Sequence, residues 1–330
     1  LTQECKLAMK AVFLDKKTFS DSIDLTSISN EVTQLSNFDI THQNDIITRC
    51  IDAEIIITNK VMLNKDILSA LPKLQLICIT ATGFNNVDIS AAQKHNIAVT
   101  NVSGYSSASV VQYVFAQLLE YFQKTSHHNN NTVEGCWSAS DNFCYHGQGF
   151  SELSGKTLGI IGYGNLGKAV ATIAQAFNMK VLISERINHN QIRTGRVAFD
   201  EVIQQADIIS LHCPQTKDTE QLINQHVLTK MKKSAVLINT ARGALIDDVA
   251  LLNALKDKQI AYAILDVLNQ EPPPADHLLL DAIVNNKLAN LKITAHIAWA
   301  SNESQQRLIN LVSKNIIAFK DGEIVNRLDH

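Results

Sequence analysis

Short apolar runs rich in β-branched residues alternate along the chain with polar-apolar segments of helical period. This alternation is typical of parallel sheets covered by helices on both faces, so it predicts an α/β protein. The first series has strands expected at 11–15, 54–58, 74–80 and 97–101, with helices near 42–50, 64–70 and 88–95. Four or five strands of this kind make one small sheet.

A long helix is expected next, because its apolar residues form one stripe, namely Val110, Val111, Val114, Leu118 and Leu119. From His127 to Gly155 the periodicity is lost, and we expect an irregular, solvated excursion there. The His127-His128 pair could indicate a metal site, but a solvated loop is the favoured interpretation. The excursion offers three aromatic residues to a partner surface: Trp137, Phe143 and Phe150.

A second alternating series begins at residue 156, with strands expected near 157–161, 180–184, 207–212, 235–239, 262–266 and 292–295. Helices are expected between them near 165–177, 200–205, 218–232 and 247–257. Six strands predict a complete dinucleotide-binding fold. A final helix over about 302–320 should end before Asp321-Gly322 and pack back on the first domain.

The composition and length exclude several classes of protein. The 330 residues predict about two domains at roughly 100–200 residues each. With 45% hydrophobic and 18% charged residues, the chain is neither disordered nor fibrous. A net charge of −3 lacks the basic footprint of a nucleic-acid binder. No apolar run approaches the 18 or more residues of a membrane span, so we expect no membrane partner.

The six cysteines are scattered, with no C-x-x-C and no metal-ligand spacing. Reduced thiols in a cytoplasmic protein without a metal site show this distribution. Residues 1–8 lack the features of a signal peptide, and the run from Met9 reads like a natural beginning, so residues 1–8 are expected to be an upstream extension.

An apolar strand, Leu158 to Ile161, runs into the loop Gly162-Tyr163-Gly164-Asn165-Leu166-Gly167. In such a G-x-G-x-x-G loop, the first glycine permits a tight turn, the second the approach of a pyrophosphate, and the third close helix–strand packing. A glycine loop that serves helix packing alone is the alternative. The absence of a G-x-x-x-x-G-K-[ST] loop disfavours an NTPase.

Glu185 ends the next expected strand, 18 residues after Gly167. A carboxylate there accepts hydrogen bonds from the adenosine ribose and repels a 2′-phosphate, which predicts NAD. The neighbouring Arg186 leaves NADP open, because a guanidinium can pair with the extra phosphate.

Three further strands deliver polar groups to their carboxyl ends: Arg242, Glu271 and His296. Taken singly, Arg242 could form a surface ion pair, Glu271 could be a solvated loop acid, and His296 could be a strand-end histidine whose hydrogen bonds are all made within the protein. Together they form the set that carbonyl reduction requires: an arginine for a substrate carboxylate, a histidine as proton donor, and a carboxylate that orients and charges the histidine.

The chain resembles the D-isomer-specific 2-hydroxyacid dehydrogenases over residues 9–330. The resemblance rests on the segments Ala81 to Asp88, Gly162 to Gly167, Ser210 to Pro214, Asn239 to Gly243 and Asp266 to Pro272, and on His296. The segments Val102 to Gln112 and His296 to Ser301 look most like the glycerate dehydrogenase (hydroxypyruvate reductase) branch. Ala295, where a proline usually precedes the histidine, and Gln112, where many relatives have glutamate, depart from the family pattern.

This resemblance implies two doubly wound parallel-sheet domains with a cleft between them: a flavodoxin-like substrate domain (1–106 and 300–330) and a Rossmann NAD domain (107–299). It implies catalysis by Arg242, Glu271 and His296, and binding of the substrate carboxylate by Arg242 and by the backbone of Thr82 and Gly83. The NAD site would comprise the glycine loop, Glu185 and His296, with the lining residues Cys213, Pro214, Thr240, Ala241 and Asp266. The family pairs through its nucleotide domains, which implies a homodimer.

Several activities remain open within this resemblance. The substrate is expected to be a 2-keto acid such as hydroxypyruvate or glyoxylate, with a D-lactate-type or other 2-keto acid reductase as the alternative. Glu271 argues against a formate-type dehydrogenase, which has glutamine there. A phosphoglycerate dehydrogenase with an added regulatory domain is not expected in a chain of this extent. A non-catalytic NAD-sensing corepressor would keep the same three polar residues.

Overall fold

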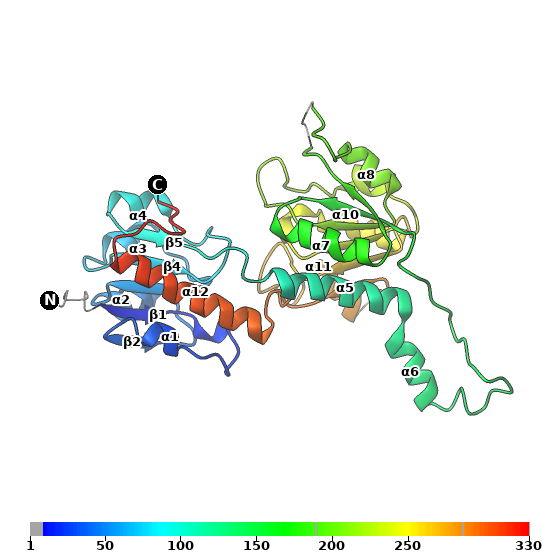
Figure 1. The fold of residues 1–330 in the computed structure, drawn as a ribbon, viewed down its shortest axis with the longest axis horizontal. Coiled ribbons are helices and arrows are strands. Elements are labelled where there is room, and N and C mark those ends of the chain that lie inside the picture. The colour runs from blue at the N-terminus through cyan, green and yellow to red at the C-terminus, as the bar shows by residue number, and fades with distance from the viewer. Residues whose placement is uncertain (1–8, 188, 190, 286, 330) are drawn as a thin grey trace. The chain divides into compact units, whose positions relative to one another are not determined.

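The computed structural model describes residues 9–187, 189, 191–285 and 287–329. The expected upstream extension, residues 1–8 with Cys5, lies outside the described residues. The chain divides into two compact units, which Figure 1 shows: Leu1–Ser106 with Trp299–His330 (unit 1), and Ser107–Ala298 (unit 2). Trp299, expected at the end of the second domain, belongs to unit 1, because its ring packs edge-on against Phe19 and Tyr105 at centroid distances of 5.7 and 6.1 Å.

Unit 1 contains a parallel sheet of the order β2-β1-β3-β4-β5, the flavodoxin-like arrangement. The strands pair in register, with Val12 opposite Ile56 and Ile56 opposite Ile77. The strands are β1 Lys10–Phe13, β2 Gln34–Asn37, β3 Ile55–Thr58, β4 Leu76–Ile79 and β5 Ala98–Thr100. The helices are α1 Thr26–Ser29, α2 Ile46–Cys50, α3 Lys65–Ser69, α4 Ile89–Lys94 and α12 Asn302–Lys320.

Alternate strand residues of unit 1 bury on opposite faces of the sheet, as a pleated strand requires. Val12, Ile56 and Ile77 pack with the apolar residues of α2, α3 and α4. Phe13, Ile57 and Cys78 of the same strands pack on the other face with α1 and α12. The last helix, α12, therefore completes the core of the first sheet, as its apolar stripe predicted, and it lies along that sheet in Figure 1.

Unit 2 contains a six-stranded parallel sheet of the order β11-β10-β9-β8-β6-β7. All six expected strands form, and the prediction of two doubly wound parallel-sheet domains is confirmed. Its strands are β6 Thr157–Ile161, β7 Lys180–Ile183, β8 Ile208–Leu211, β9 Val236–Asn239, β10 Tyr262–Leu265 and β11 Leu291–Ile293. Its helices are α5 Ser107–Gln123, α6 Thr125–Val133, α7 Asn165–Ala176, α8 Phe199–Gln205, α9 Gln225–Lys230, α10 Asp248–Lys256 and α11 Leu278–Val284.

The order of strands in unit 2 reverses between β6 and β8: β7 lies on one side of β6, and the chain then crosses to the other side. Ligands of open α/β sheets bind at the carboxyl ends of the strands at such a switch point. One face of the sheet buries Ile209, Leu237 and Leu265 against residues of α8, α9, α10 and α11. The strand residues that alternate with these three point to the other face of the sheet, on which α7 packs. Helix α7 in turn packs against α5.

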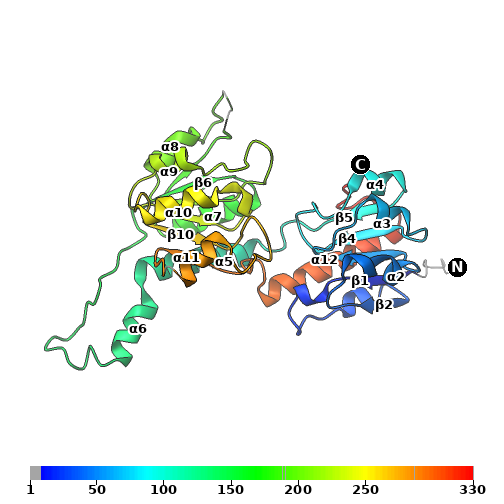
Figure 2. The same cartoon turned by 180° about the vertical axis from the view of Figure 1, so that it is seen from behind.

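Two sequence expectations were wrong locally. Residues 125–133 form helix α6, where an irregular loop was expected; the helix buries no side chain but closes local bonds, such as Asn131 Nδ2 with His127 Nε2 at 3.1 Å. In Figures 1 and 2, α6 and the stretch after it stand away from the sheet of unit 2. The helix expected over 218–232 begins only at Gln225, because the side chain of Asn224 caps it by accepting from Val227 N.

Within the described ranges, no helix is long and apolar enough to cross a membrane. The same ranges contain no group of three His, Cys, Asp or Glu side chains placed to hold a metal ion.

Candidate active site

The glycine loop lies at the switch point, between the end of β6 and the start of α7. Gly162 has a φ of +97°, and a Cβ there would lie 2.4 Å from the backbone nitrogen of Cys213. A Cβ on Gly167 would lie 2.1 Å from the carbonyl oxygen of Gly162. Both positions therefore require glycine. Gly164 has no atom within 4 Å of its hypothetical Cβ, so its backbone is open to a ligand.

These surroundings fit a dinucleotide. The hydroxyl of Thr240, at the end of β9, is buried and has no hydrogen-bond partner among the described residues, as expected of a group that awaits a ligand. Cys213 and Pro214 follow β8 beside Gly162, and burial raises the pKa of the Cys213 thiol to about 11. The thiol is therefore protonated at neutral pH and lines the site as a small apolar group.

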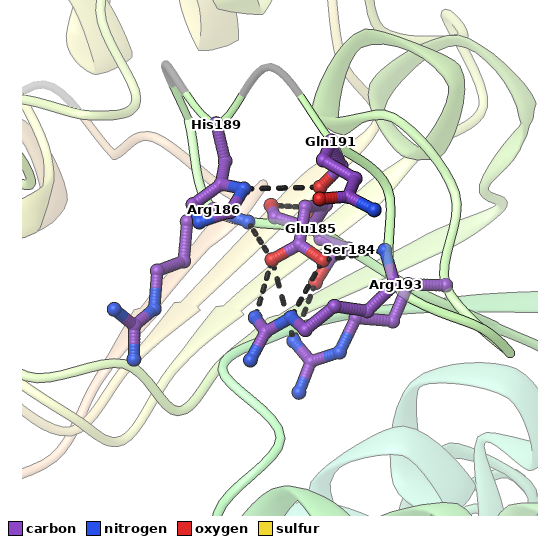
Figure 3. A network of polar contacts seen from close by, with 7 residues as sticks. Ser184, Glu185, Arg186, His189, Gln191 and Arg193 are labelled. Atoms are coloured by element: carbon purple, nitrogen blue, oxygen red, sulfur yellow. Dashed lines mark hydrogen bonds and ion pairs between the residues drawn. The ribbon is translucent and has the colours of Figure 1, made fainter.

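Glu185 follows β7 at the expected strand end, where its carboxylate was expected to accept hydrogen bonds from the adenosine ribose. In the structure this carboxylate already pairs with an arginine. Its side chain is only 2% exposed and forms a two-pronged ion pair with Arg193 (Figure 3). The hydrogen bonds of Arg193 hold the pKa of the Glu185 carboxyl well below its usual range. Arg193 was missed in the sequence, because it lies eight residues further on in a loop that has no periodic pattern.

His296 and Glu271 form the closest polar contact among the three predicted catalytic residues. Nδ1 of His296 lies 2.6 Å from Oε2 of Glu271, and the backbone N–H of Leu268 donates to Oε1 of the same carboxylate at 3.0 Å. Both side chains are about one-third exposed, at 29% and 34%. A carboxylate on Nδ1 fixes that nitrogen as a donor and directs Nε2 away from Glu271.

Asp266, predicted to line the cofactor, holds the turn that carries His296. Its carboxylate accepts from the backbone N–H groups of Ile297 and Ala298 at 2.9 and 2.8 Å, and from the hydroxyl of Thr294 at 2.6 Å. Its carbonyl oxygen accepts from the N–H of His296 at 2.8 Å. These bonds stabilise a left-handed backbone at His296, where φ is +53°. Thr294 was missed in the sequence, although it stands two residues before the histidine.

Arg242 follows β9 and is half-buried. The next residue, Gly243, lies so close to the end of the neighbouring strand that a Cβ there would be 2.0 Å from the carbonyl carbon of Leu268. This approach joins the Arg242 turn to the segment that leads from β10 to Glu271. The structure therefore brings Glu271 and His296 into contact and delivers Arg242, Glu271 and His296 from three adjacent strands, β9, β10 and β11.

Thr82 and Gly83 lie in unit 1, after the end of β4. The carbonyl oxygen of Thr82 accepts from Asn101 Nδ2 at 2.8 Å, and its hydroxyl donates to the carbonyl of Val102 at 2.9 Å. These two bonds fix the loop. The role of its backbone in binding a substrate carboxylate stays a prediction.

The Rossmann unit, its glycine loop and the histidine–carboxylate pair define an NAD-binding oxidoreductase. Residues 115–298 match the model of the D-isomer specific 2-hydroxyacid dehydrogenase, NAD binding domain. A Haemophilus influenzae protein that carries a 2-hydroxyacid dehydrogenase name is 43% identical over 311 residues, which are 94% of this chain and 98% of that protein. A glycerate dehydrogenase of Methylorubrum extorquens is 38% identical over 320 residues, 97% of this chain and 99% of that protein.

Among solved structures, an acyclic imino acid reductase in complex with NADPH and D-Arg has a TM-score of 0.80 at 29% identity, covering 97% of this chain and 100% of that one. The chain belongs to the D-isomer specific 2-hydroxyacid dehydrogenase family.

Proposed function

We propose that the protein reduces a short 2-keto acid, hydroxypyruvate or glyoxylate, to the D-2-hydroxy acid, and that it runs the reverse oxidation. The observation that carries this proposal is the 2.6 Å contact between His296 Nδ1 and Glu271 Oε2, which orients the imidazole of His296 as a proton donor. The name of the Methylorubrum extorquens relative supports the choice of substrate.

The residues of this chain divide the work of a carbonyl reduction. The bound nicotinamide coenzyme supplies the hydride. Arg242 pairs with the substrate carboxylate, His296 donates its proton to the carbonyl oxygen, and Glu271 keeps the imidazole oriented. Asp266 positions His296 through the backbone of the turn. In the oxidative direction, neutral His296 accepts the proton of the hydroxyl.

The substrate is tested by initial rates with hydroxypyruvate, glyoxylate, pyruvate and phosphohydroxypyruvate. We expect the highest kcat/KM for hydroxypyruvate or glyoxylate. A preference for pyruvate would support the D-lactate-type alternative. Absence of turnover with every acid, in a protein that still binds NADH, would contradict the proposal and favour a non-catalytic NAD sensor.

Arg242→Lys should lose on the order of 10²-fold in kcat/KM, because a planar guanidinium engages a carboxylate through two parallel bonds and an ammonium does not. Initial rates with the preferred acid measure the loss, and an unchanged thermal unfolding midpoint shows that the fold is intact. Activity within threefold of wild type would place Arg242 outside the substrate site.

Glu271→Gln should shift the pH dependence of both directions to lower pH, because it removes the negative charge that lies 2.6 Å from the His296 imidazole. Reduction needs protonated His296, so the alkaline limb of kcat/KM moves down. Oxidation needs neutral His296, so its acidic limb moves down as well.

Parallel pH–rate profiles of wild type and Glu271→Gln measure this shift. Glu220→Gln, which removes an exposed acid of the same unit, is the matched control and should leave both limbs in place. Limbs that do not move in Glu271→Gln, or that move to higher pH, would mean that Glu271 does not set the charge of His296.

We further propose that the protein is a cytoplasmic homodimer that pairs through the stretch 125–150. Free thiols at the five described cysteines support the cytoplasm. Apolar side chains exposed on one protruding segment support a second copy as their partner. They are Val133, Trp137, Phe143 and Phe150, at 79%, 51%, 92% and 59% exposure.

Sedimentation equilibrium across the micromolar range should give twice the chain mass of 36.4 kDa. Trp137→Glu combined with Phe143→Glu should shift the mass toward the monomer, because two charges would be buried without partners. Val249→Glu, at a 60% exposed apolar residue in the first turn of α10, is the control and should stay dimeric. A wild-type monomer at all these concentrations contradicts the homodimer.

A further inference from the structure

The end of β7 carries one carboxylate and three guanidinium groups. Glu185 is buried, whereas the side chains of Arg193 and Arg196 are 46% and 19% exposed, and Arg186 is exposed. In Figure 3 the guanidinium of Arg193 lies against the Glu185 carboxylate, and the side chain of Arg186 extends away from it. Positive charge therefore exceeds negative charge at the strand end where a Rossmann fold receives the adenosine ribose.

The acceptor capacity of Glu185 is already filled. Oε1 accepts from the backbone N–H of Arg186 at 2.8 Å and from a terminal nitrogen of Arg193. Oε2 accepts from the backbone N–H and the Nε of Arg193 at 3.1 and 2.8 Å. A carboxylate offers about four lone-pair sites, so these four bonds leave none for ribose hydroxyls. In this arrangement Glu185 also repels a 2′-phosphate less, because Arg193 neutralises its charge.

The other two arginines differ in their contacts with Glu185: Nη1 of Arg196 lies 3.9 Å from Oε1 of the carboxylate, whereas the guanidinium of Arg186 does not pair with it. The guanidinium of Arg186 makes no hydrogen bond or ion pair with any residue in the described ranges. Arg196 lies over the ring of Tyr163, a residue of the glycine loop, with its guanidinium carbon 6.0 Å from the ring centroid. It also donates to the carbonyl of Ser184 at 3.2 Å. Through this contact the three arginines at the end of β7 adjoin the glycine loop, where the pyrophosphate is expected to bind.

We infer that the end of β7 is a 2′-phosphate site, in which Arg186 and Arg193 bind the 2′-phosphate of NADP(H) and Glu185 is a positioning residue that holds Arg193. Arg196 adds a third cation beside Tyr163. The protein then accepts the phosphorylated coenzyme in addition to NAD(H). This inference rests on dinucleotide binding by unit 2 and is independent of the proposed 2-keto acid.

Calorimetry of the full-length protein with three adenine nucleotides tests the site without any turnover. 5′-AMP lacks the 2′-phosphate, 2′,5′-ADP has it, and 3′,5′-ADP carries the same charge on the neighbouring hydroxyl. We expect 2′,5′-ADP to bind about tenfold more tightly than 5′-AMP, and 3′,5′-ADP to bind within threefold of 5′-AMP. Weaker binding of 2′,5′-ADP than of 5′-AMP would overturn the inference, as would equal affinity for the two bisphosphates.

Variants separate the phosphate contact from folding. Arg186→Gln and Arg193→Gln should each weaken 2′,5′-ADP about tenfold while 5′-AMP changes less than threefold. Arg186 is the safer position, because its guanidinium has no hydrogen-bond or ion-pair partner among the described residues that the substitution would remove. Lys256→Gln, which removes an exposed cation at the end of α10, should change neither affinity. An Arg186→Gln protein with unchanged 2′,5′-ADP affinity, or one that loses both nucleotides equally, would overturn the assignment.

Discussion

The carboxyl edge of the unit 2 sheet depends on backbone-to-backbone contact at two glycines. Gly162 lets the glycine loop approach the end of β8, and Gly243 lets the Arg242 turn approach the end of β10. A single added carbon would meet backbone atoms at 2.4 and 2.0 Å, and backbone does not move aside as a flexible side chain does. The glycine loop and the arginine turn are therefore fixed by the main chain, which is the rigid support that a functional site needs.

Asp266 extends the same principle to the histidine. A left-handed backbone costs a residue such as His296 about 1–2 kcal/mol. The carboxylate and the carbonyl of Asp266 offset this cost by accepting three backbone N–H groups from residues 296–298. Because β10 and β11 are neighbours, one strand end thus positions the histidine that follows the other. The departure from the family pattern at Ala295 lies within this turn, and the Asp266 bonds hold the turn without the proline.

The sequence predicts strands well where they are buried on both faces, because short apolar runs of β-branched residues, such as Ile55 to Ile57, are typical of buried strands. β2 was not singled out, since Gln34-Leu35-Ser36-Asn37 at the edge of its sheet is mostly polar. α6 was missed because no buried face imposes a period on it. The strand-end residues Arg242, Glu271 and His296 were predictable from position alone, since parallel strands present their carboxyl ends together. The contacts that Asp266 and Arg193 make were not predictable, because their partners are brought together by the folding of loops.

Glu185 and Glu271 show why position alone is insufficient. Both follow parallel strands, and both accept a hydrogen bond from a basic side chain. Glu185 is 2% exposed and its four acceptor sites are filled by two backbone N–H groups and a guanidinium that is permanently charged. Glu271 is 34% exposed, and its partner is an imidazole, a side chain that can transfer a proton in catalysis. The first carboxylate can therefore only position its arginine, whereas the second can orient a general acid, because only the partner of Glu271 is a side chain suited to proton transfer.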